Sequence, residues 1–281
     1  MLIPFVTTRS TSSERLYRRD GDGGSPTSHS SSISAGGSTL TASTCGKGGG
    51  RSSTIPKGQF FAGRQQGGGT RDQVFGSKTF GSGYPNVTGR GVAGRDLPFC
   101  FWLITWGGVA GAGPAYLRTR EYGRGGNNSR PGGVMVYAIF SSNPANQSSF
   151  RVLADNQTIV NLIDGIHSYC SSNLGPVSST TPLAYNDTSG ASPQPEQPIQ
   201  YFRASSVALT LDGYNNSATF TNEGTPDTPL PGNIDTTLLN CLNQTIGLAV
   251  PLIDGADSRW AASNMGFLGL AWVIWSLSSS F

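Results

Sequence analysis

The sequence predicts an α+β domain, in which an antiparallel sheet carries two helices on one face, preceded by a long disordered arm. Two observations lead to this expectation. Residues 133–253 show strand and helix periodicity in the order β-β-α-β-β-α, over about 120 residues, which is long enough for one hydrophobic core. Before this region the composition differs, because 29 of the 39 glycines lie at or before Gly133. The chain of 281 residues therefore divides into a glycine-rich part and a globular part.

The first two strands are expected at 134–140 and 150–154. The first segment reads Val-Met-Val-Tyr-Ala-Ile-Phe, an unbroken apolar run of the length of a strand. The second reads Phe-Arg-Val-Leu-Ala and follows a polar, serine-containing stretch. We expect both segments to be buried in the same antiparallel sheet.

A helix is expected directly after the second strand. Asn156 or Thr158 can cap its first turn with a side-chain oxygen. Apolar residues then recur at i, i+3, i+4 and i+7, which is the spacing of one buried helix face. These residues are Ile159, Leu162, Ile163 and Ile166.

The second half of the sheet is expected around a tight turn. After a loop rich in Ser, Pro and Thr at 171–197, residues 205–211 alternate as a strand. Residues 212–216 read Asp-Gly-Tyr-Asn-Asn, which is strong turn chemistry. We therefore expect 217–220 to pair back on 205–211 as a short strand.

A second helix follows a proline-rich loop, with Asn233 or Asp235 as its cap. Its apolar face is formed by Leu238, Leu239, Leu242 and Ile246. This helix and the first one each contain a cysteine.

Of the four cysteines, Cys170 and Cys241 form the expected disulfide bond, because both lie on the predicted helices of one domain. Closing so long a loop stabilises a fold by roughly 4 kcal/mol in the chain-entropy model. Cys45 lies in low-complexity sequence and Cys100 in an apolar stretch, so their pairing stays open.

The glycine-rich part is expected to contain two segments. Residues 1–72 carry Ser/Thr/Gly tracts with few aliphatic residues, which predicts a disordered arm. Residues 73–132 interleave glycines with aromatic residues and form an apolar strip that docks on the globular domain of residues 133–253 or self-associates. Within it, 97–117 is uncharged for a length that formally suits a membrane span, although its prolines and glycines disfavour a helix.

Charge divides in the same way as composition. Up to Gly133 there are 16 Lys and Arg against 6 Asp and Glu, and after it 3 against 10. The overall charge of +3 thus combines +10 on the first part with −7 on the second. A basic arm of this kind is either a solvated spacer or a binding segment for an anionic partner, such as a cell-wall polysaccharide or a membrane headgroup.

The C-terminus predicts a compartment. Residues 265–277 form an uncharged apolar run that is too short to span a bilayer, for which about 20 residues are needed. The run has the length of the last part of a glycosylphosphatidylinositol (GPI) attachment signal, here 254–281. Small residues at 254–257 suit the attachment site, and we expect the anchor at Gly255. A polar spacer, 258–264, lies between them.

Seven N-x-Ser/Thr sequons support the same compartment. Their asparagines are Asn86, Asn127, Asn146, Asn156, Asn186, Asn215 and Asn243. Passage through the secretory pathway also requires a leader, and residues 1–6 are too short for its apolar core. We therefore expect the natural N-terminus to lie further upstream.

Motifs that would carry chemistry are weak. Gly89 to Gly94 match G-x-G-x-x-G, but tyrosine and proline precede the motif and no helix is expected after it, so we expect no dinucleotide cofactor. His167 lies near Asp164 and Cys170 on the first helix, which is more typical of a surface histidine beside a disulfide bond. With two histidines in the chain, a histidine-based metal site is not expected.

A carboxylate pair of the glycosidase type is the remaining enzymatic possibility. Its candidates are Asp155, Asp164, Asp212, Glu223, Asp227 and Asp235. All of them lie where turns and caps are also expected. The sparse Arg-Gly elements at 89–91 and 124–126 resemble RNA-binding segments, but an extracellular chain is not expected to bind nucleic acid.

Several segments are similar to a group of uncharacterised fungal cell-surface proteins. They are Gly83-Tyr84-Pro85, residues 89–95, Pro98-Phe99, Trp106-Gly107-Gly108, residues 224–231 and residues 239–245. The resemblance covers about residues 75–281 and implies a fungal surface protein without implying any activity.

The sequence thus favours a non-enzymatic cell-surface glycoprotein, structural or adhesive, held in the outer leaflet of the plasma membrane by a processed C-terminus. The alternatives are a secreted carbohydrate-active or carbohydrate-binding protein and an integral membrane protein that spans at 97–117. A concave cluster of carboxylates among aromatic residues in the 133–253 domain would favour the first alternative.

Overall fold

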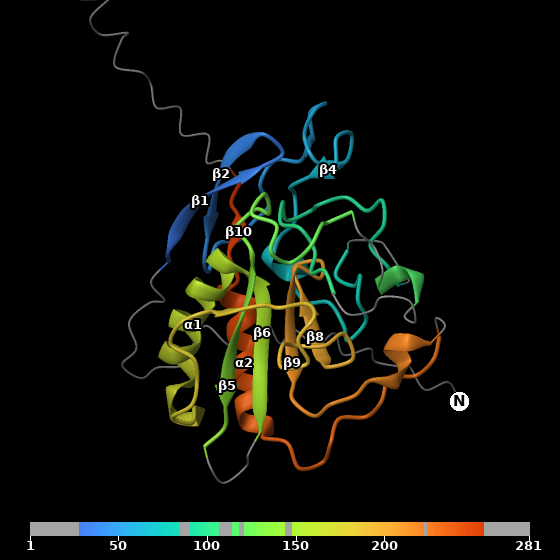
Figure 1. Cartoon of the computed structure of the whole chain (residues 1–281). Helices are drawn as coiled ribbons and strands as arrows, with labels where there is room; N and C mark the ends of the chain where they lie inside the picture. The colour runs from blue at the N-terminus through green and yellow to red at the C-terminus, as the bar shows by residue number, and fades with distance from the viewer. Residues whose placement is uncertain are drawn as a thin grey trace, which may run out of the picture.

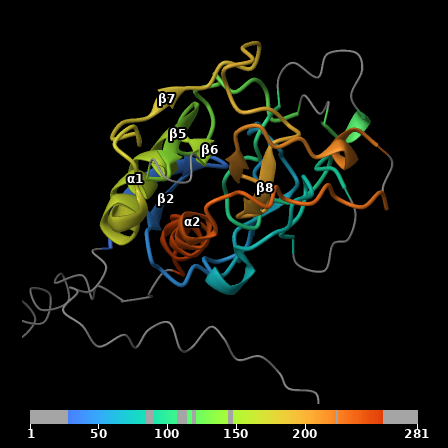
Figure 2. The ribbon, with the colours of Figure 1, turned by 90° about the horizontal axis from the view of Figure 1, so that it is seen from below.

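The computed structural model describes residues 28–84, 90–106, 114–117, 121–143, 148–221 and 224–255. Its centre is a five-stranded antiparallel sheet with the strand order β7-β5-β6-β9-β8, and helices α1 and α2 lie against one face of it (Figures 1 and 2). A second sheet, β1-β2-β10, lies beyond the end of α1 and α2. The expected α+β class, with antiparallel sheets and two helices, is confirmed.

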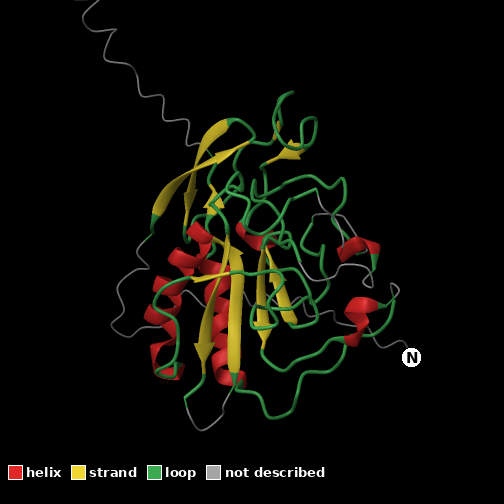
Figure 3. Ribbon diagram, in the orientation of Figure 1, coloured by secondary structure: helices red, strands yellow, loops and turns green. Residues whose placement is uncertain are grey.

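The elements have the following bounds. The strands are β1 (Ser30–Ala35), β2 (Ser38–Ser43), β3 (Ser53–Thr54), β4 (Gln65–Gln66), β5 (Met135–Ser141), β6 (Ser149–Asp155), β7 (Leu183–Ala184), β8 (Pro198–Phe202), β9 (Val207–Leu211) and β10 (Leu252–Ile253). The helices are α1 (Asn156–Cys170) and α2 (Thr236–Ala249). The 3₁₀ helices of the described residues are Arg71–Gln73, Ala115–Leu117, Ser171–Asn173 and Ser217–Phe220. Figure 3 shows that loops form much of the remainder of the described molecule.

The expected first pair of strands is confirmed. β5 and β6 pair antiparallel along their full length, from Met135 opposite Asp155 to Ser141 opposite Ser149. Phe140 and Phe150 face each other across this ladder and are fully buried. The apolar runs form strands because both faces of the sheet are covered, so that nearly every side chain of β6 is buried.

The prediction that residues 217–220 pair with β9 as a strand is wrong. β9 lies where a strand was predicted, but Ser217–Phe220 forms a 3₁₀ helix and does not pair with it. β6 and β8 occupy the two sides of β9, so no open edge is left for a further strand. The turn at 212–216 is present and leads the chain away from the sheet.

Both helices begin at an aspartate. Asp155 caps α1 through a hydrogen bond from the N–H of Thr158, so neither Asn156 nor Thr158 is the cap. Asp235 caps α2 through a hydrogen bond from the N–H of Leu238, as one of the two expected alternatives. The predicted apolar face of α1 is buried, and that of α2 is buried except for Leu239, which is half-buried.

The disulfide bond between Cys170 and Cys241 is confirmed. It joins the last residue of α1 to the second turn of α2, with the two Cα atoms 5.8 Å apart. The bond therefore fastens the two helices that cover the sheet.

Residues 28–72 are not a disordered arm. Gly36 and Gly37 have φ angles of 55° and 78° and form the two-residue turn between β1 and β2. β2 then pairs with β10, and Ile33 is buried against the core. Composition did not predict this hairpin, because its strands consist mostly of serine and threonine and carry few apolar residues. Residues 1–27 lie outside the described chain.

The apolar strip is part of the core. Residues 97–106 run without helix or strand, apart from one bridge at Leu97, and most of their side chains are buried. The buried side chains include Phe99, Phe101, Trp102, Leu103, Ile104 and Trp106. No helix in the described part of the chain has the length and apolar character that a membrane span requires. The alternative of a membrane span at 97–117 therefore finds no helix in 97–106, and 107–113 lie outside the described residues.

One hydrophobic core joins the three segments that were expected at 1–72, 73–132 and 133–253, over the residues that the structure describes. It extends without a break from Ile33 in β1 through Trp102 to Ile253 in β10. The expected boundaries at 72 and 132 therefore do not separate folded units. The reason is that the central sheet and helices leave apolar surface that the glycine-rich segments cover.

Arginines hold these irregular segments in place. Arg71 donates to the carbonyls of Gly247 and Val250 at the end of α2, at 3.2 and 2.7 Å, and Arg90 donates to the carbonyl of Ala218 at 2.6 Å. Loop carbonyls have no ladder partner, and the five N–H donors of a guanidinium can satisfy several of them. This part of the positive charge therefore stabilises the fold. Other arginines that donate to main-chain carbonyls are Arg64, Arg95, Arg130, Arg151 and Arg203.

Candidate functional site

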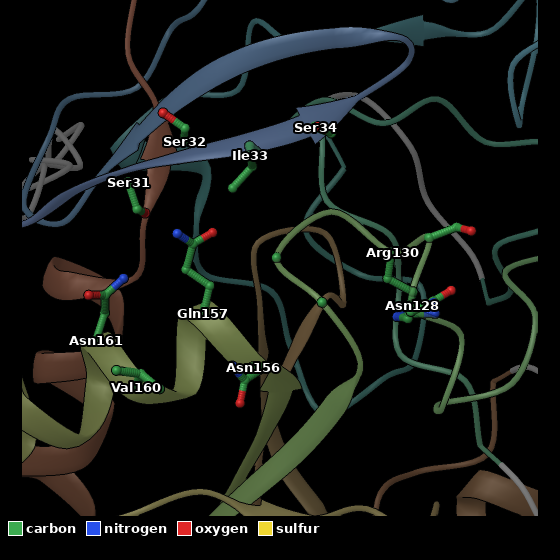
Figure 4. Close-up of a pocket in the computed structure, with 13 residues that line it drawn as sticks. Ser31, Ser32, Ile33, Ser34, Asn128, Arg130, Asn156, Gln157, Val160 and Asn161 are labelled. Carbon is green, nitrogen blue, oxygen red and sulfur yellow. The ribbon is translucent and has the colours of Figure 1, made fainter.

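A groove of about 590 Å³ opens between β1 and the start of α1 (Figure 4). We call it the serine groove. Three segments line it: β1, the loop before β5 and the first two turns of α1. The lining residues are Ser31, Ser32, Ile33, Ser34, Asn128, Ser129, Arg130, Gly132, Gly133, Asn156, Gln157, Val160 and Asn161. Figure 4 shows Gln157 and Ile33 pointing toward each other across the groove.

The floor of the groove is set by the junction of α1 and the preceding loop. The N–H of Gln157 donates to the carbonyl of Gly132 at 2.9 Å, and the N–H of Asn156 donates to that of Val134 at 2.9 Å. Gly132 has a φ of 84°, and a Cβ there would overlap with the carboxylate of Asp155. Only glycine therefore allows the loop to lie this close to the helix cap.

The serine groove is neutral and polar. The first three N–H groups of α1 are occupied by Gly132, Val134 and the cap, so the helix terminus offers no anion site. The Oγ of Ser31 is buried and has no hydrogen-bond partner among the described residues. Hydroxyl and amide groups that both donate and accept suit the hydroxyls of a neutral saccharide better than an anion or a metal ion.

Arg130 is the one charged residue in the lining, and its side chain is directed to the protein interior. It is 4% exposed and donates to the carbonyls of Tyr122, Trp102 and Leu103. Burial lowers the pKa of its guanidinium to about 10, while Asp155 and Tyr122 act in the opposite direction. Arg130 therefore holds the wall of the groove.

A buried ion pair lies at the helix cap beside the groove. Nη2 of Arg203 is 2.7 Å from Oδ2 of Asp155, and both side chains are buried. Thr158 completes the contact, since its hydroxyl donates to Asp155 at 2.8 Å and accepts from Arg203 at 2.9 Å. Every charged atom of the pair thus has a partner, as a buried pair requires.

Arg203 also connects distant segments. Its guanidinium lies 3.5 Å above the centre of the Phe101 ring and donates to the carbonyl of Pro251 at 3.0 Å and to the hydroxyl of Ser206 at 2.7 Å. Burial lowers the pKa of Arg203, and Asp155 acts in the opposite direction. The residue has a φ of 50° in the turn between β8 and β9, a left-handed conformation that costs about 1–3 kcal/mol without such compensating contacts.

A second groove of about 540 Å³ lies next to the edge strand β7 of the five-stranded sheet, and we call it the tyrosine groove. Its lining residues are Arg124, Gly125, Gly126, Asn127, Tyr185, Asn186 and Asp187. The ring of Tyr185 lies on Gly125, where a Cβ would come within 2.8 Å of the ring. Two of the sequon asparagines share this groove.

The carboxylates that could form a catalytic pair are dispersed. Asp155 pairs with Arg203, Asp212 pairs with Arg151 at 2.8 Å, and Asp235 caps α2. Two others are Asp227, which accepts from Asn216, and Asp164, which is exposed on α1. Glu223 lies outside the described residues. No three metal-ligating side chains of the described residues lie together.

The remaining motifs have structural contacts. His167 bonds through Nε2 to the carbonyl of Ser179 at 2.8 Å and packs edge-on to Phe140. Of the G-x-G-x-x-G motif, Gly89 lies outside the described residues, and no helix follows Gly94 in the described segment 90–106.

The other two cysteines are free thiols. Cys45 is partly buried and Cys100 is buried. Burial raises the pKa of Cys100 to about 12, so almost none of it is the reactive thiolate near neutral pH. Burial also raises the pKa of Cys45, against the opposing influences of Arg71 and Thr44.

The sequon residues fall into two groups. Asn127, Asn186 and Asn215 lie on loops, whereas Asn156 and Asn243 lie on α1 and α2. Asn86 and Asn146 lie outside the described residues. Gly255, the expected anchor site, is exposed directly after β10, and its N–H donates to the carbonyl of Gly48 at 3.3 Å. The rest of the tail, 256–281, lies outside the described chain.

Sequence reasoning missed the grooves and the residues that organise them. Arg130 and Arg203 carry no local pattern that indicates burial. The Gly36-Gly37 pair between two serine-rich runs was a usable sign of a hairpin, and that hairpin supplies one wall of the serine groove. Comparison with protein-family models, curated proteins and solved structures found no match to this chain.

Proposed function

We propose that this chain is a non-enzymatic glycoprotein of the cell surface with a structural or adhesive role, held at the membrane through its C-terminus. The observation that carries the proposal is the disulfide bond between Cys170 and Cys241, which fastens α1 to α2. Structural disulfide bonds of this kind persist in oxidising compartments. Exposed sequon asparagines such as Asn186 and Asn215 are accessible to glycosylation in the same compartment.

A lipid at Gly255 would lie next to the described sheet β1-β2-β10. Gly255 is exposed, and the preceding Asp254 pairs with Gly49. An anchor there would hold the sheet β1-β2-β10 next to the membrane, with no linker between them. The proposed partner is thus the membrane through the anchor, with a wall polysaccharide as a second partner.

The contacts of the acidic residues support a non-enzymatic role. Asp155, Asp212 and Asp235 each hold a buried or half-buried structural contact. Catalytic carboxylates of a glycosidase need an open site on both sides of a scissile bond. Among the described residues, neither groove holds two carboxylates that face each other.

The test of the first proposal uses the full-length gene in a eukaryotic host. Phosphatidylinositol-specific phospholipase C added to intact cells is expected to release the protein into the medium. A matched chain that ends at Asn264, without the apolar run, is expected to appear in the medium without the enzyme. A protein that stays with the cells and still contains peptide 265–281 by mass spectrometry would contradict the anchor.

The lining of the serine groove favours a second candidate function, binding of a neutral saccharide. Gln157 and Asn161 face the groove from one helix (Figure 4). These groups can donate to and accept from sugar hydroxyls. Adhesion through a neutral wall polysaccharide would use this groove.

Binding to neutral oligosaccharides can be measured by calorimetry with Gln157→Ala and Asn161→Ala. Each change removes a hydrogen bond worth about 1 kcal/mol, so we expect the affinity to fall roughly five-fold. Gln59→Ala, at an exposed glutamine outside both grooves, is the matched control and should bind as the unaltered protein does. Equal affinities in all four proteins, or no binding of any neutral oligosaccharide, would exclude the serine groove as the site.

A further inference from the structure

Two sequons open into the tyrosine groove from different parts of the chain. Asn127 lies in the loop before β5, and Asn186 lies two residues after β7. The fold brings them to one groove because β5 and β7 are paired, with Tyr137 opposite Leu183. Of the five described sequons, these two share a groove.

Both asparagines form an Asx turn, Asn186 at an exposed position and Asn127 at a half-buried one. Oδ1 of Asn186 accepts from the N–H of Thr188 at 3.0 Å and from its hydroxyl at 2.8 Å. Oδ1 of Asn127 accepts from the N–H of Ser129 at 2.9 Å. These are Asx turns, which span three residues and form locally. In both, Nδ2 has no hydrogen bond to another described residue.

We propose that Asn127 and Asn186 carry N-linked oligosaccharides that emerge from the tyrosine groove and cover the edge strand β7. The inference rests on the proposed passage through the secretory pathway. In the transfer, Nδ2 bonds to C1 of an oligosaccharide diphosphate lipid, the bond from C1 to the diphosphate breaks, and Nδ2 gives one proton to a base of the transferase. Hydrogen bonds donated to Oδ1 polarise the amide and ease the loss of that proton.

The helical sequons lack this geometry. Asn156 is exposed, but the N–H and the hydroxyl of Thr158 both donate to Asp155, and Thr158 is fully buried. Asn243 is half-buried on α2, and the hydroxyl of Thr245 lies at Cys170. In both sequons the residue that must assist the asparagine is directed into the core.

Asn215 is a sequon asparagine that is exposed but forms no Asx turn, so it tests which of the two features matters for glycosylation. It is exposed, like Asn186, but the N–H of Ser217 donates to the hydroxyl of Thr228 at 3.1 Å. The Asx turn is therefore not formed, and we expect fewer chains to be modified at Asn215 than at Asn186.

The covered strand gives the modification a physical role. β7 is the outermost strand of the five-stranded sheet, and its Leu183 is 37% exposed. Such an edge presents main-chain donors and acceptors that can pair with a second chain. Two glycans next to β7 would block that pairing, which suits a protein concentrated at a surface.

The test measures site occupancy on protein secreted by a eukaryotic host. Peptide N-glycosidase in ¹⁸O-labelled water converts each glycosylated asparagine to labelled aspartate, which mass spectrometry locates. We expect label at Asn127 and Asn186 in most chains and little at Asn156 and Asn243. Asn127→Gln and Asn186→Gln should each lose the mass of one glycan, whereas the matched controls Asn156→Gln and Asn243→Gln should lose none.

The outcomes separate this inference from the proposed function. Absence of label at every sequon would overturn the glycoprotein proposal itself. Label at the helical sequons on as many chains as at Asn186, or unlabelled Asn127 and Asn186 in an otherwise labelled protein, would overturn this inference alone. Equal labelling of Asn215 and Asn186 would overturn the role of the Asx turn. In size-exclusion chromatography we expect the double variant Asn127→Gln/Asn186→Gln to self-associate. The double control Asn156→Gln/Asn243→Gln should not self-associate. A monomeric Asn127→Gln/Asn186→Gln variant would overturn the shielding of β7.

Discussion

Replacing Arg203 with methionine is expected to lower the free energy of unfolding by about 3–5 kcal/mol, because Asp155 is then left as a buried carboxylate without its charged partner. The guanidinium is fully buried, and its loss also removes donors to Thr158, Ser206 and Pro251. Methionine fills much of the same volume, so the effect reports on charge and hydrogen bonding more than on a cavity. Urea unfolding followed by circular dichroism measures it.

The double variant Arg203→Met/Asp155→Asn is the control for this expectation. Asparagine keeps a side-chain oxygen that can cap α1, while it removes the buried charge. We therefore expect the double variant to be more stable than Arg203→Met alone. If Arg203→Met unfolds within about 1 kcal/mol of the unaltered protein, as ordinary surface changes do, the ion pair does not hold the fold.

The large effect is expected because Arg203 joins the two parts of the chain that differ in composition. Through Phe101 it contacts the irregular glycine-rich segment, and through Asp155 it contacts the cap of α1. The main-chain N–H of the same residue donates to the carbonyl of Val74 at 2.7 Å. Removing the Arg203 side chain would loosen the loops that cover the sheet and, with them, the wall of the serine groove.

The elements that could be predicted from the sequence are those with a local signal. α1 and α2 have apolar residues at helical spacing and an aspartate within one position of an expected cap. The strands β5, β6 and β9 are short apolar runs with turn residues on at least one side. The disulfide bond followed from these helices, since Cys170 and Cys241 lie on the two predicted helices of one domain.

The parts that could not be predicted depend on contacts between distant residues. β8 begins at Pro198, and its register with β9 is set by a turn in which Arg203, Ala204 and Ser205 all have positive φ. No propensity predicts three such residues in a row without glycine. Their conformation is maintained by the burial of Arg203 and by a hydrogen bond from the N–H of Ile104 to the carbonyl of Ser205.

Composition was also misleading for 28–72 and 97–106. Residues 97–106 have no regular hydrogen-bond ladder, and in 28–72 the ladders are short. Arginines satisfy carbonyls in both segments, since Arg71 donates to Gly46 and Arg130 donates to Trp102. Glycine-rich sequence predicts disorder when no partner surface is known. The serine groove could not be predicted either, because its walls come from residues 31–34, 128–133 and 156–161.

Breaking the disulfide bond is expected to have an effect of similar size. The bond closes a loop with a sequence separation of 71, and the chain-entropy model gives about 4 kcal/mol for a loop of that length. For a chain of this size, that corresponds to a melting temperature lower by roughly 8–16 °C. Cys241→Ser is the cleaner change, because Cys241 is half-buried whereas Cys170 is fully buried.

Two comparisons separate loop entropy from local packing. Cys170→Ala and Cys241→Ser break the same bond, so the loss of loop entropy should lower the melting temperature by a similar amount in both variants. Any further decrease of the melting temperature in Cys170→Ala measures the packing of Cys170 against Thr245. Dithiothreitol should lower the melting temperature of the unaltered protein by the same amount and leave both variants unchanged, because Cys45 and Cys100 are already free thiols. A melting temperature of the unaltered protein that does not respond to the reductant would refute the bond, and with it the strongest support for an oxidising compartment.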